Sequence, residues 1–378
     1  MNSLEYMIQV RRHLHRFPEL SLQEEKTAAY LMDRLQELGY APVSIANTGV
    51  YADYTLSPEK PWLLFRADID ALPVTEQTGL PFASENPGKM HACGHDGHAA
   101  MLLGAAKAFR EGALSTRYNL RFAFQPAEEM YGGADRMIQA GVLPENLAGA
   151  FGFHLWPQVP YGRLGWRQGT LMASNDRFSI AIQGRGAHAA MQNSGRNALQ
   201  AGAALATEIS RLATRLLPPN RGALVFVGTL NAGSGYNIVA DRCTLEGTVR
   251  TLAPGDRDTI EQGLQDLAAG IAAIHGVEIQ VEYVRQYPPL QTSPEAAAEI
   301  GRIFPAELLW EVPEPFMTGE DFAFFTEKVN GGMLLLGTGR EDYPHPLHSG
   351  CFTFDESLME LGVHAYGILA NGDWRKTS

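Results

Sequence analysis

Short apolar runs in the first half of the chain each end in polar or acidic residues. WLLF (62–65) leads into RADID, NLRFAF (119–124) leads into QPAEE, and AGAFGF (148–153) leads into His154. Runs of this length, separated by helical patterns, predict an α/β domain whose sheet is mixed and largely parallel. Because ligand sites of such sheets lie at the carboxyl ends of the strands, the polar tails are candidates for one shared site.

The first helical pattern follows Ser21. Ser21 and Glu24 have the S-x-x-E spacing of a capping box, in which the two side chains cap the start of a helix. Leu31 and Leu35 then repeat at a helical interval, and Gly39 is a suitable stop. The pattern therefore predicts a helix that begins close to Ser21 and ends before Gly39.

The middle of the chain has a different pattern. RFSIAIQG alternates, with Phe178, Ile180 and Ile182 on one face, and a helical pattern of apolar residues follows between 205 and 216. Two further strand candidates, ALVFVGTL and CTLEGTVR, precede a second helical pattern and the alternating run EIQVEYV. The order β-α-β-β-α-β is that of a ferredoxin-like α+β sandwich.

This order predicts a discontinuous arrangement of two domains. Residues 174–288 would form an inserted ferredoxin-like domain, and residues 1–173 and 289–378 would together form the α/β domain. The α/β domain would resume with MLLLG (333–337) and a final helix after Asp355. The length of 378 residues also favours two domains over a single core.

Composition and charge indicate a globular protein and argue against some classes of partner. The chain is 45% hydrophobic and 19% charged, as expected for a packed globular protein. Its net charge of -12 argues against nucleic acid or an anionic membrane surface as a partner, because both require a basic patch. No stretch is long and apolar enough to span a bilayer, so we expect no membrane association.

The cysteines and the first residues indicate a reducing compartment. Cys93, Cys243 and Cys351 are widely spaced and odd in number, which disfavours a disulfide framework. MNSLEYMIQVRRHLHRF carries charges where a signal peptide has an apolar region. We therefore expect a cytoplasmic protein.

The segment HACGHDGH (91–98) concentrates groups that bind metals. Side chains two residues apart in an extended segment point the same way, so Cys93 and His95 could reach one ion. Thiolate and imidazole together suit zinc or another first-row divalent cation. Asp96 could orient a ligand histidine. The alternative is a packed cysteine beside a histidine that caps a helix.

Further candidates follow the later strands. Glu128 and Glu129 come directly after a strand, where one carboxylate can bind metal while its neighbour acts as general base. Alternatively, both are solvated loop residues. His154 ends a predicted strand, and His345 and His348 lie in a late loop, YPHPLHSG. This set is too large for one tetrahedral ion with an open position, so two metal ions become reasonable.

Seven motifs in order resemble those of one enzyme family. They are RADIDALP, HACGHDGHAAMLLGAA, FQPAEE, FGFHLWP, GRGAHAA, GEDFAFF and LHSGCF. The chain is similar in these motifs to the dinuclear metallo-aminoacylases, which include N-acyl-L-amino acid amidohydrolases, hippurate hydrolases and auxin-conjugate hydrolases. The resemblance covers nearly the whole chain, and the two-domain plan of the family agrees with the inserted unit.

The resemblance implies a role for particular residues. Five residues match the ligands of two divalent ions, which could be Mn²⁺, Zn²⁺, Co²⁺ or Ni²⁺: Cys93, His95, Glu129, His154 and His348. Glu128 matches the general base, and Asp70 matches an acid that orients a ligand. His188 matches a histidine that serves the neighbouring subunit's site, which implies a homodimer and a lid role for the inserted domain. Asn237 and Arg250 match groups near the substrate.

The implied reaction is hydrolysis of the amide bond of N-acyl-L-amino acids by a metal-bridged hydroxide. Three alternatives remain open: a dipeptidase or carboxypeptidase on the same scaffold, a hydrolase with Cys93 as nucleophile, and a binding protein without catalysis. The chain departs from relatives at Gln192 and Asn193, at Arg196-Asn197, and in NIVA (237–240). These departures leave the metal ligands intact and affect the expected preference for acyl group and amino acid.

Overall fold

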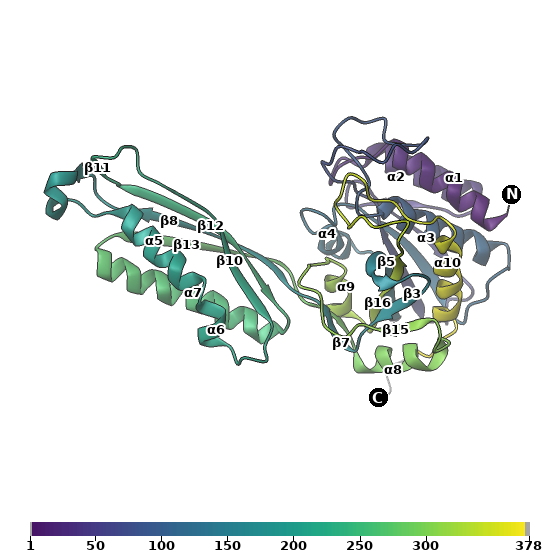
Figure 1. Ribbon diagram of the computed structural model, residues 1–378. Helices are drawn as coiled ribbons and strands as arrows, with labels where there is room; N and C mark the ends of the chain where they lie inside the picture. The colour runs from purple at the N-terminus through teal and green to yellow at the C-terminus, as the bar shows by residue number, and fades with distance from the viewer. Residues whose placement is uncertain (1, 375–378) are drawn as a thin grey trace. The chain divides into compact units, whose positions relative to one another are not determined.

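The computed structural model describes residues 2–374 of the chain. Its contacts divide the chain into two compact units (Figure 1). The first unit contains the residues up to 171, residues 291–314 and the residues from 321 onward. The second unit contains residues 172–290 and 315–320.

The first unit is built on a mixed eight-stranded sheet with the order β1-β2-β4-β3-β5-β16-β6-β15. Its strands are β1 (Val43–Ile45), β2 (Gly49–Tyr54), β3 (Trp62–Asp68), β4 (Asn119–Gln125), β5 (Leu147–Pro160), β6 (Leu164–Trp166), β15 (Leu309–Glu311) and β16 (Gly331–Gly339). The four central strands, β4, β3, β5 and β16, run parallel. This agrees with the largely parallel sheet that the apolar runs predict.

Buried strands explain why these runs are continuous rather than alternating. Every residue of β4 is buried, and so is every residue of β3 after Trp62. A parallel sheet covered on both faces requires such runs. The helices of this unit are α1 (Ser3–Arg16), α2 (Glu25–Glu37), α3 (His95–Arg110), α4 (Gly133–Gln139), α8 (Pro294–Ile303), α9 (Ala323–Lys328) and α10 (Leu358–Leu369). α3 packs against β3, α1 and α10 (Figure 1).

Strand β5 continues past the predicted end. The sequence places His154 at the end of the strand, whereas β5 runs on to Pro160 because β16 pairs with it as far as Gly339. Gly152 is the last residue of β5 that pairs with β3. His154 therefore still lies at the level where the neighbouring strand β3 ends.

The predicted capping box at Ser21 and Glu24 is wrong. Helix α2 begins at Glu25, and the side chain of Glu24 makes no hydrogen bond to the helix end. The hydroxyl of Ser21 donates instead to Asp70 Oδ2, at 2.7 Å. The capping carboxylate comes from Glu19, which accepts from the backbone N–H of Thr27 at 2.9 Å.

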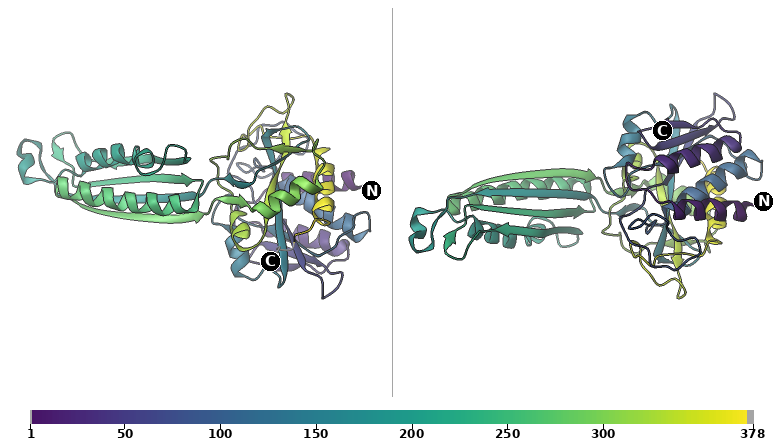
Figure 2. Two further views of the ribbon diagram at one scale, coloured as in Figure 1. Left: turned by 90° about the horizontal axis from the view of Figure 1, so that it is seen from below. Right: turned by 90° about the horizontal axis from the view of Figure 1, so that it is seen from above.

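The second unit has an antiparallel sheet with the order β10-β12-β8-β13. Its elements are β8 (Asn175–Gln183), β9 (Ala187–His188), η1 (Ala189–Ser194), α5 (Ala198–Ile209), α6 (Leu212–Leu216), β10 (Ala223–Ala232), β11 (Ile238–Val239), β12 (Arg242–Thr251), α7 (Pro254–His275) and β13 (Glu278–Tyr287). Helices α5 and α7 pack against one face of this sheet (Figures 1 and 2). Phe178, Ile180 and Ile182 are buried beneath them, as the alternation predicts.

A further pair of strands lies outside the two larger sheets. β7 (Gly169–Met172) and β14 (Leu290–Thr292) form a separate two-stranded sheet. Among residues 2–374, no helix combines the length and the apolar character that crossing a membrane requires.

Candidate metal centre and active site

Cys93 lies in the turn that leads into helix α3, and His95 is the first residue of that helix. Between them, Gly94 has a φ of 85°, in the left-handed region that favours glycine. A Cβ on Gly94 would also approach Leu155 Cδ1 to 2.9 Å. A glycine at this position therefore lets the turn bring both side chains towards strand β5.

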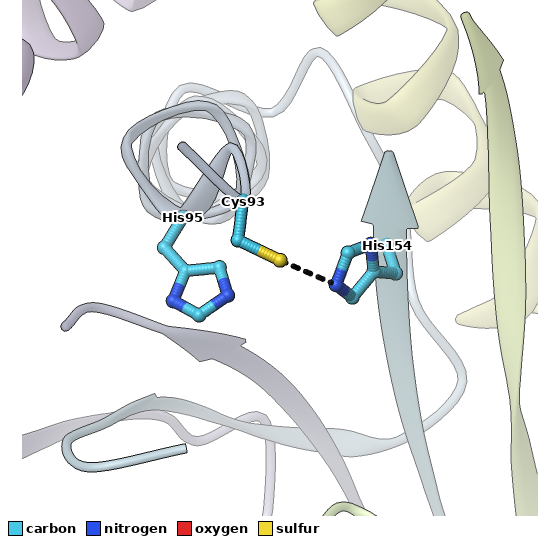
Figure 3. Close-up of side chains that lie close together, drawn as sticks. All are labelled: Cys93, His95 and His154. Atoms are coloured by element: carbon cyan, nitrogen blue, oxygen red, sulfur yellow. Dashed lines mark hydrogen bonds between the residues drawn. The ribbon is translucent and has the colours of Figure 1, made fainter. Parts of the chain in front are cut away.

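The sulfur of Cys93 faces His154 from the neighbouring strand (Figure 3). Cys93 Sγ lies 3.5 Å from His154 Nε2. The Nδ1 atom of His154 donates to the backbone oxygen of Leu155 at 2.8 Å, so Nε2 keeps its lone pair. Both side chains are buried.

The loop that carries His348 meets Cys93 from the other side. The backbone N–H of His348 donates to Ala92 O at 2.8 Å, which ties this loop to the residue before Cys93. His348 Nε2 lies 3.4 Å from Glu129 Oε1. His345, the other histidine of the loop, is exposed and belongs to none of the groups of potential ligands among the described residues.

The five predicted ligands form two groups that share one residue. Cys93, His95 and His154 form the first group, and Cys93, Glu129 and His348 form the second. Within each group, the potential ligand atoms lie within 4.8 Å of one another. A thiolate common to both groups is suited to bridge two cations.

Unsatisfied atoms support the fit of a cation to this site. His95 Nε2 and Glu129 Oε1 are buried without a hydrogen-bond partner. A buried polar atom left in this state costs about 1–3 kcal/mol, unless a ligand completes it. Thiolate, imidazole and carboxylate are the donors that first-row divalent ions prefer. The residues present therefore fit a pair of divalent cations.

The carboxylates around the site create a strongly negative field. Burial raises the pKa of the Cys93 thiol well above its usual value, and Glu129, Glu128 and Asp68 raise it further. Reactive cysteine nucleophiles have lowered pKa values instead. Without a bound cation, this environment therefore disfavours the thiolate that a cysteine nucleophile requires.

Asp70 contacts both the histidine and the glutamate pair. Its backbone oxygen accepts from His95 Nδ1 at 2.9 Å, which directs Nε2 of the ring towards the ligand groups. Its carboxylate accepts from the backbone N–H groups of Glu128 and Glu129, each at 3.1 Å. Burial lowers the pKa of His95, but Asp68 and Asp70 outweigh it and raise that pKa to about 10.

A buried polar network behind the ligands was not assigned from the sequence. His98 Nδ1 bonds Asp68 Oδ1 at 2.6 Å, and His98 Nε2 accepts from the backbone N–H of Leu155 at 2.9 Å. Asp68 also accepts from Arg66, which bonds Asp321 at 2.8 Å. The motifs RADID, HACGHDGH and GEDF contain Arg66 and Asp68, His98, and Asp321 respectively, but only the fold shows that these residues meet.

Asp96 does not orient a ligand histidine, in contrast to the expectation. Its Oδ2 atom accepts from Arg11 Nε at 3.2 Å and lies 2.9 Å from His15 Nδ1. Both partners belong to helix α1. Asp96 therefore joins α1 to the start of α3, directly after His95.

The remaining predicted residues belong to the second unit. His188 is exposed, and its Nδ1 accepts from the backbone N–H of Ala190 at 3.1 Å. Asn237 is close to it, because the backbone N–H of Ala189 donates to Asn237 O at 2.9 Å. Gln192 and Asn193, which depart from the family pattern, are exposed in η1.

Arg250 lies far from His188 within this unit. Its side chain bonds Asn175, at the opposite end of β12 from the segment that contacts β9. At about 3.3 Å per residue, the eight steps from Arg242 to Arg250 span roughly 26 Å. One copy of this unit therefore does not bring Arg250 and His188 to a common substrate.

Comparisons with known proteins agree on one family. Residues 64–371 match the model of peptidase family M20/M25/M40. An N-acetyl-L-cysteine deacetylase of Bacillus subtilis is 38% identical, over 93% of this chain and 84% of the relative. An N-acetyldiaminopimelate deacetylase of Streptococcus uberis is 36% identical, over 94% of this chain and 96% of the relative.

The solved structures include a Bacillus subtilis protein described as a dinuclear metal binding peptidase of the M20 family. It aligns with a TM-score of 0.83 and 33% identity, covering 97% of each chain. That protein shares the fold of this chain, and its description as dinuclear applies to its own site.

Proposed function

The chain belongs to peptidase family M20/M25/M40, and from that premise we propose that it hydrolyses the amide bond of N-acyl-L-amino acids. The products are a carboxylic acid and a free amino acid. The relatives named as deacetylases of N-acetylated amino acids support this substrate class. The observation that carries the proposal is the pair of ligand groups that share Cys93, next to the buried Glu128.

Two divalent cations complete the site. Cys93, His95 and His154 would hold one ion, and Cys93, Glu129 and His348 would hold the other. Mn²⁺, Zn²⁺, Co²⁺ and Ni²⁺ all suit these donors. When bound, the ions polarise the amide carbonyl and lower the pKa of water.

Glu128 acts as general base and then as general acid. It accepts a proton from the attacking water and delivers this proton to the nitrogen of the leaving amino acid. The hydrogen bond from the Glu128 N–H to Asp70 fixes the backbone of the base beside the ligand groups.

The second unit serves as a lid and as a dimerisation domain. The family resemblance assigns His188 to the oxyanion of the neighbouring subunit's site, with Asn237 beside it. Arg250 holds the carboxylate of the amino acid product. The large separation of Arg250 from His188 supports a site that takes these residues from two copies of the chain.

The state of the cysteines supports a proposal about the cellular compartment. Cys93, Cys243 and Cys351 are all free. Widely spaced thiols without a disulfide are typical of proteins in reducing compartments, which supports a location in the cytoplasm.

A substrate screen tests the proposal. The purified protein is treated with chelator, reloaded with Mn²⁺ or Zn²⁺, and given N-acetyl amino acids, N-benzoyl amino acids and dipeptides in parallel. We expect hydrolysis of N-acyl amino acids that chelator abolishes and metal restores. Faster turnover of dipeptides would contradict the proposed substrate class, and activity that survives chelator would contradict the metal-dependent mechanism.

A further inference from the structure

Three consecutive backbone N–H groups at the Glu128 loop donate to two buried carboxylates. Ala127 N donates to Glu24 Oε1 at 2.9 Å. Glu128 N and Glu129 N donate to the two oxygens of Asp70, each at 3.1 Å. Asp70 already has a role by resemblance, but Glu24 has none.

Glu24 is buried and does not cap the helix that follows it, so its carboxylate is free to bond Thr48 and the Glu128 loop. Glu19 caps the helix instead, by accepting from both the N–H and the hydroxyl of Thr27. The carboxylate of Glu24 bonds Thr48 Oγ1, at 2.7 Å, and the N–H of Ala127.

A carboxylate at this place is electrostatically unfavourable. Burial raises the pKa of Glu24, and the charge of nearby Asp70 raises it too, despite the hydrogen bonds that lower it. An apolar side chain of the same length would avoid this cost. We therefore expect the carboxylate to make an interaction that offsets the cost of its burial, and the hydrogen bond from the Ala127 N–H is such an interaction.

Ala127 is held in a conformation that alanine rarely adopts. Its φ is +55°, in the left-handed region, which is sterically unfavourable for a residue with a Cβ. The loop is also confined from its other side, because the N–H of Gly133 donates to Ala127 O at 3.1 Å. A Cβ on Gly133 would lie 1.6 Å from Pro126 O. The turn therefore has little room to relax, and it sets the direction in which Glu128 leaves the strand.

We propose that Glu24 is a positioning residue for the general base: it holds Ala127 in the left-handed turn that aims Glu128 at the ligand groups. The inference rests on the proposed function, because it takes Glu128 as the base. The carboxylate of Glu24 bonds Thr48 and the N–H of Ala127, and it acts on Glu128 through the backbone of Ala127.

Substitution of Glu24 separates this role from a general structural one. Glu24→Met keeps the length of the side chain and removes both acceptors, whereas Glu24→Gln keeps one acceptor for Ala127 N–H. With the metal-loaded protein, we expect Glu24→Met to lower kcat about 10- to 100-fold, with KM and the dissociation constant for Mn²⁺ nearly unchanged. Glu24→Gln should recover most of kcat. Glu25→Met, at the exposed neighbouring position, is the matched control and should resemble the wild type.

Hydrogen exchange of the metal-free protein provides a readout that needs no activity. The amides of residues 127–129 should exchange faster in Glu24→Met than in the wild type, while amides of the central strand β3 keep their protection. Introducing Glu24→Met in an Ala127→Gly background should reduce the loss of kcat, because glycine adopts a positive φ without the steric cost. This background also relieves the loop if Glu24→Met alone folds poorly.

The kinetic and exchange measurements distinguish failure of the Glu24 proposal from failure of the proposed function. If wild-type protein hydrolyses N-acyl amino acids and Glu24→Met matches it in both kcat and exchange at 127–129, the role of Glu24 is overturned. If wild-type protein shows no such hydrolysis, the proposed function fails. The exchange measurement would then still decide whether Glu24 holds the loop.

Discussion

At the scale of single residues, the site depends on carboxylates that lie next to imidazoles in a buried setting. His95 sits between Asp68 and Asp70, and these two carboxylates overcome the effect of burial on its pKa. At His154, burial and the nearby His98 outweigh the effect of Asp68 and lower the pKa well below the usual value. The same type of residue therefore has opposite protonation tendencies at two positions of one site.

Loss of the general base should stop turnover without loss of metal. Glu128→Gln keeps the shape of the side chain but cannot accept the proton from water. We expect kcat to fall by about 10²–10⁴-fold, the range typical of general bases, while the bound metal stays at the wild-type level. Steady-state kinetics and metal analysis of the same sample check this. Near-normal turnover would exclude Glu128 as the base.

His15 should make the stability of the protein depend on pH. Burial lowers its pKa, but Asp96 and Glu76 outweigh this and raise it to about 9. The stabilisation from the charged ring is complete below the unfolded pKa of about 6.5 and is lost as the pH rises through 9. The difference in free energy of unfolding between wild type and His15→Gln should therefore shrink by a few kcal/mol between pH 6 and pH 10.

His13 supplies a matched control on the same helix. It stacks on Tyr30 with ring centroids 3.9 Å apart, and burial together with the charges of Arg34 and Arg16 lowers its pKa. His13→Gln should therefore show the opposite trend, because protonation of His13 destabilises the fold at low pH. A pH-independent difference for His15→Gln in urea unfolding would contradict the assignment of a charged ring.

At the scale of elements, the junction between α1 and α3 holds the turn that carries the ligands. Arg11 reaches across from α1 to Asp96 in the first turn of α3, and it is 2% exposed. It also bonds Glu356, at 3.0 Å. A carboxylate near the start of a helix is further favoured by the helix dipole.

Arg11 and Arg12 offer a direct comparison of a buried and an exposed ion pair. Both contact Glu356, but the Arg12 side chain is 46% exposed. Arg11→Met should lower the free energy of unfolding by about 3 kcal/mol, because it removes one of the two cationic partners of the buried Asp96 and leaves only His15. Arg12→Met should cost about 1 kcal/mol or less. Equal effects of the two substitutions in urea unfolding would show that burial of the pair is unimportant.

Some elements could be predicted from the sequence and others could not. The apolar runs of β3 and β4 and the alternation of β8 indicate their strands, because burial alone selects those residues. The S-x-x-E signal at Ser21 and Glu24 is misleading, since both side chains bond partners far along the chain, at Asp70 and Ala127. Local spacing carries no information about such partners.

The residues of the candidate site likewise divide into those that the sequence indicates and those that only the fold brings together. Cys93 and His95 are recognisable because they are only two positions apart and both residue types bind metals. Asp68 and His98 are 30 positions apart, and their hydrogen bond depends on how α3 packs on β3. Asp321 joins Arg66 across 255 positions, which no local pattern reveals.

At the scale of the whole molecule, the proposed role of His188 requires the second unit to act on the site of another copy. His188 and Arg250 lie at opposite ends of that unit, so one active site would receive them from two subunits. Exposed Tyr236 and Ile238 lie next to Asn237 and His188 along the chain and along β11, which leaves apolar surface around the histidine.

Mixed dimers test this arrangement. Glu128→Gln and His188→Ala should each be nearly inactive alone. If His188 serves the neighbouring subunit, reassembly of the two variants creates one complete site in each mixed dimer, and activity should return to about a quarter of the wild-type level. Activity that stays at the level of the separate variants, despite confirmed mixed dimers, would place His188 in its own subunit's site.

In the proposed metal centre, Cys93 belongs to both groups of ligands, and each group holds one divalent ion. Anomalous diffraction from crystals of the protein reloaded with Mn²⁺ or Zn²⁺ measures this most directly. We predict two peaks, both within bonding distance of Cys93 Sγ, one beside His95 and His154 and the other beside Glu129 and His348. A fully active crystalline enzyme with no peak within reach of Cys93 would contradict the account.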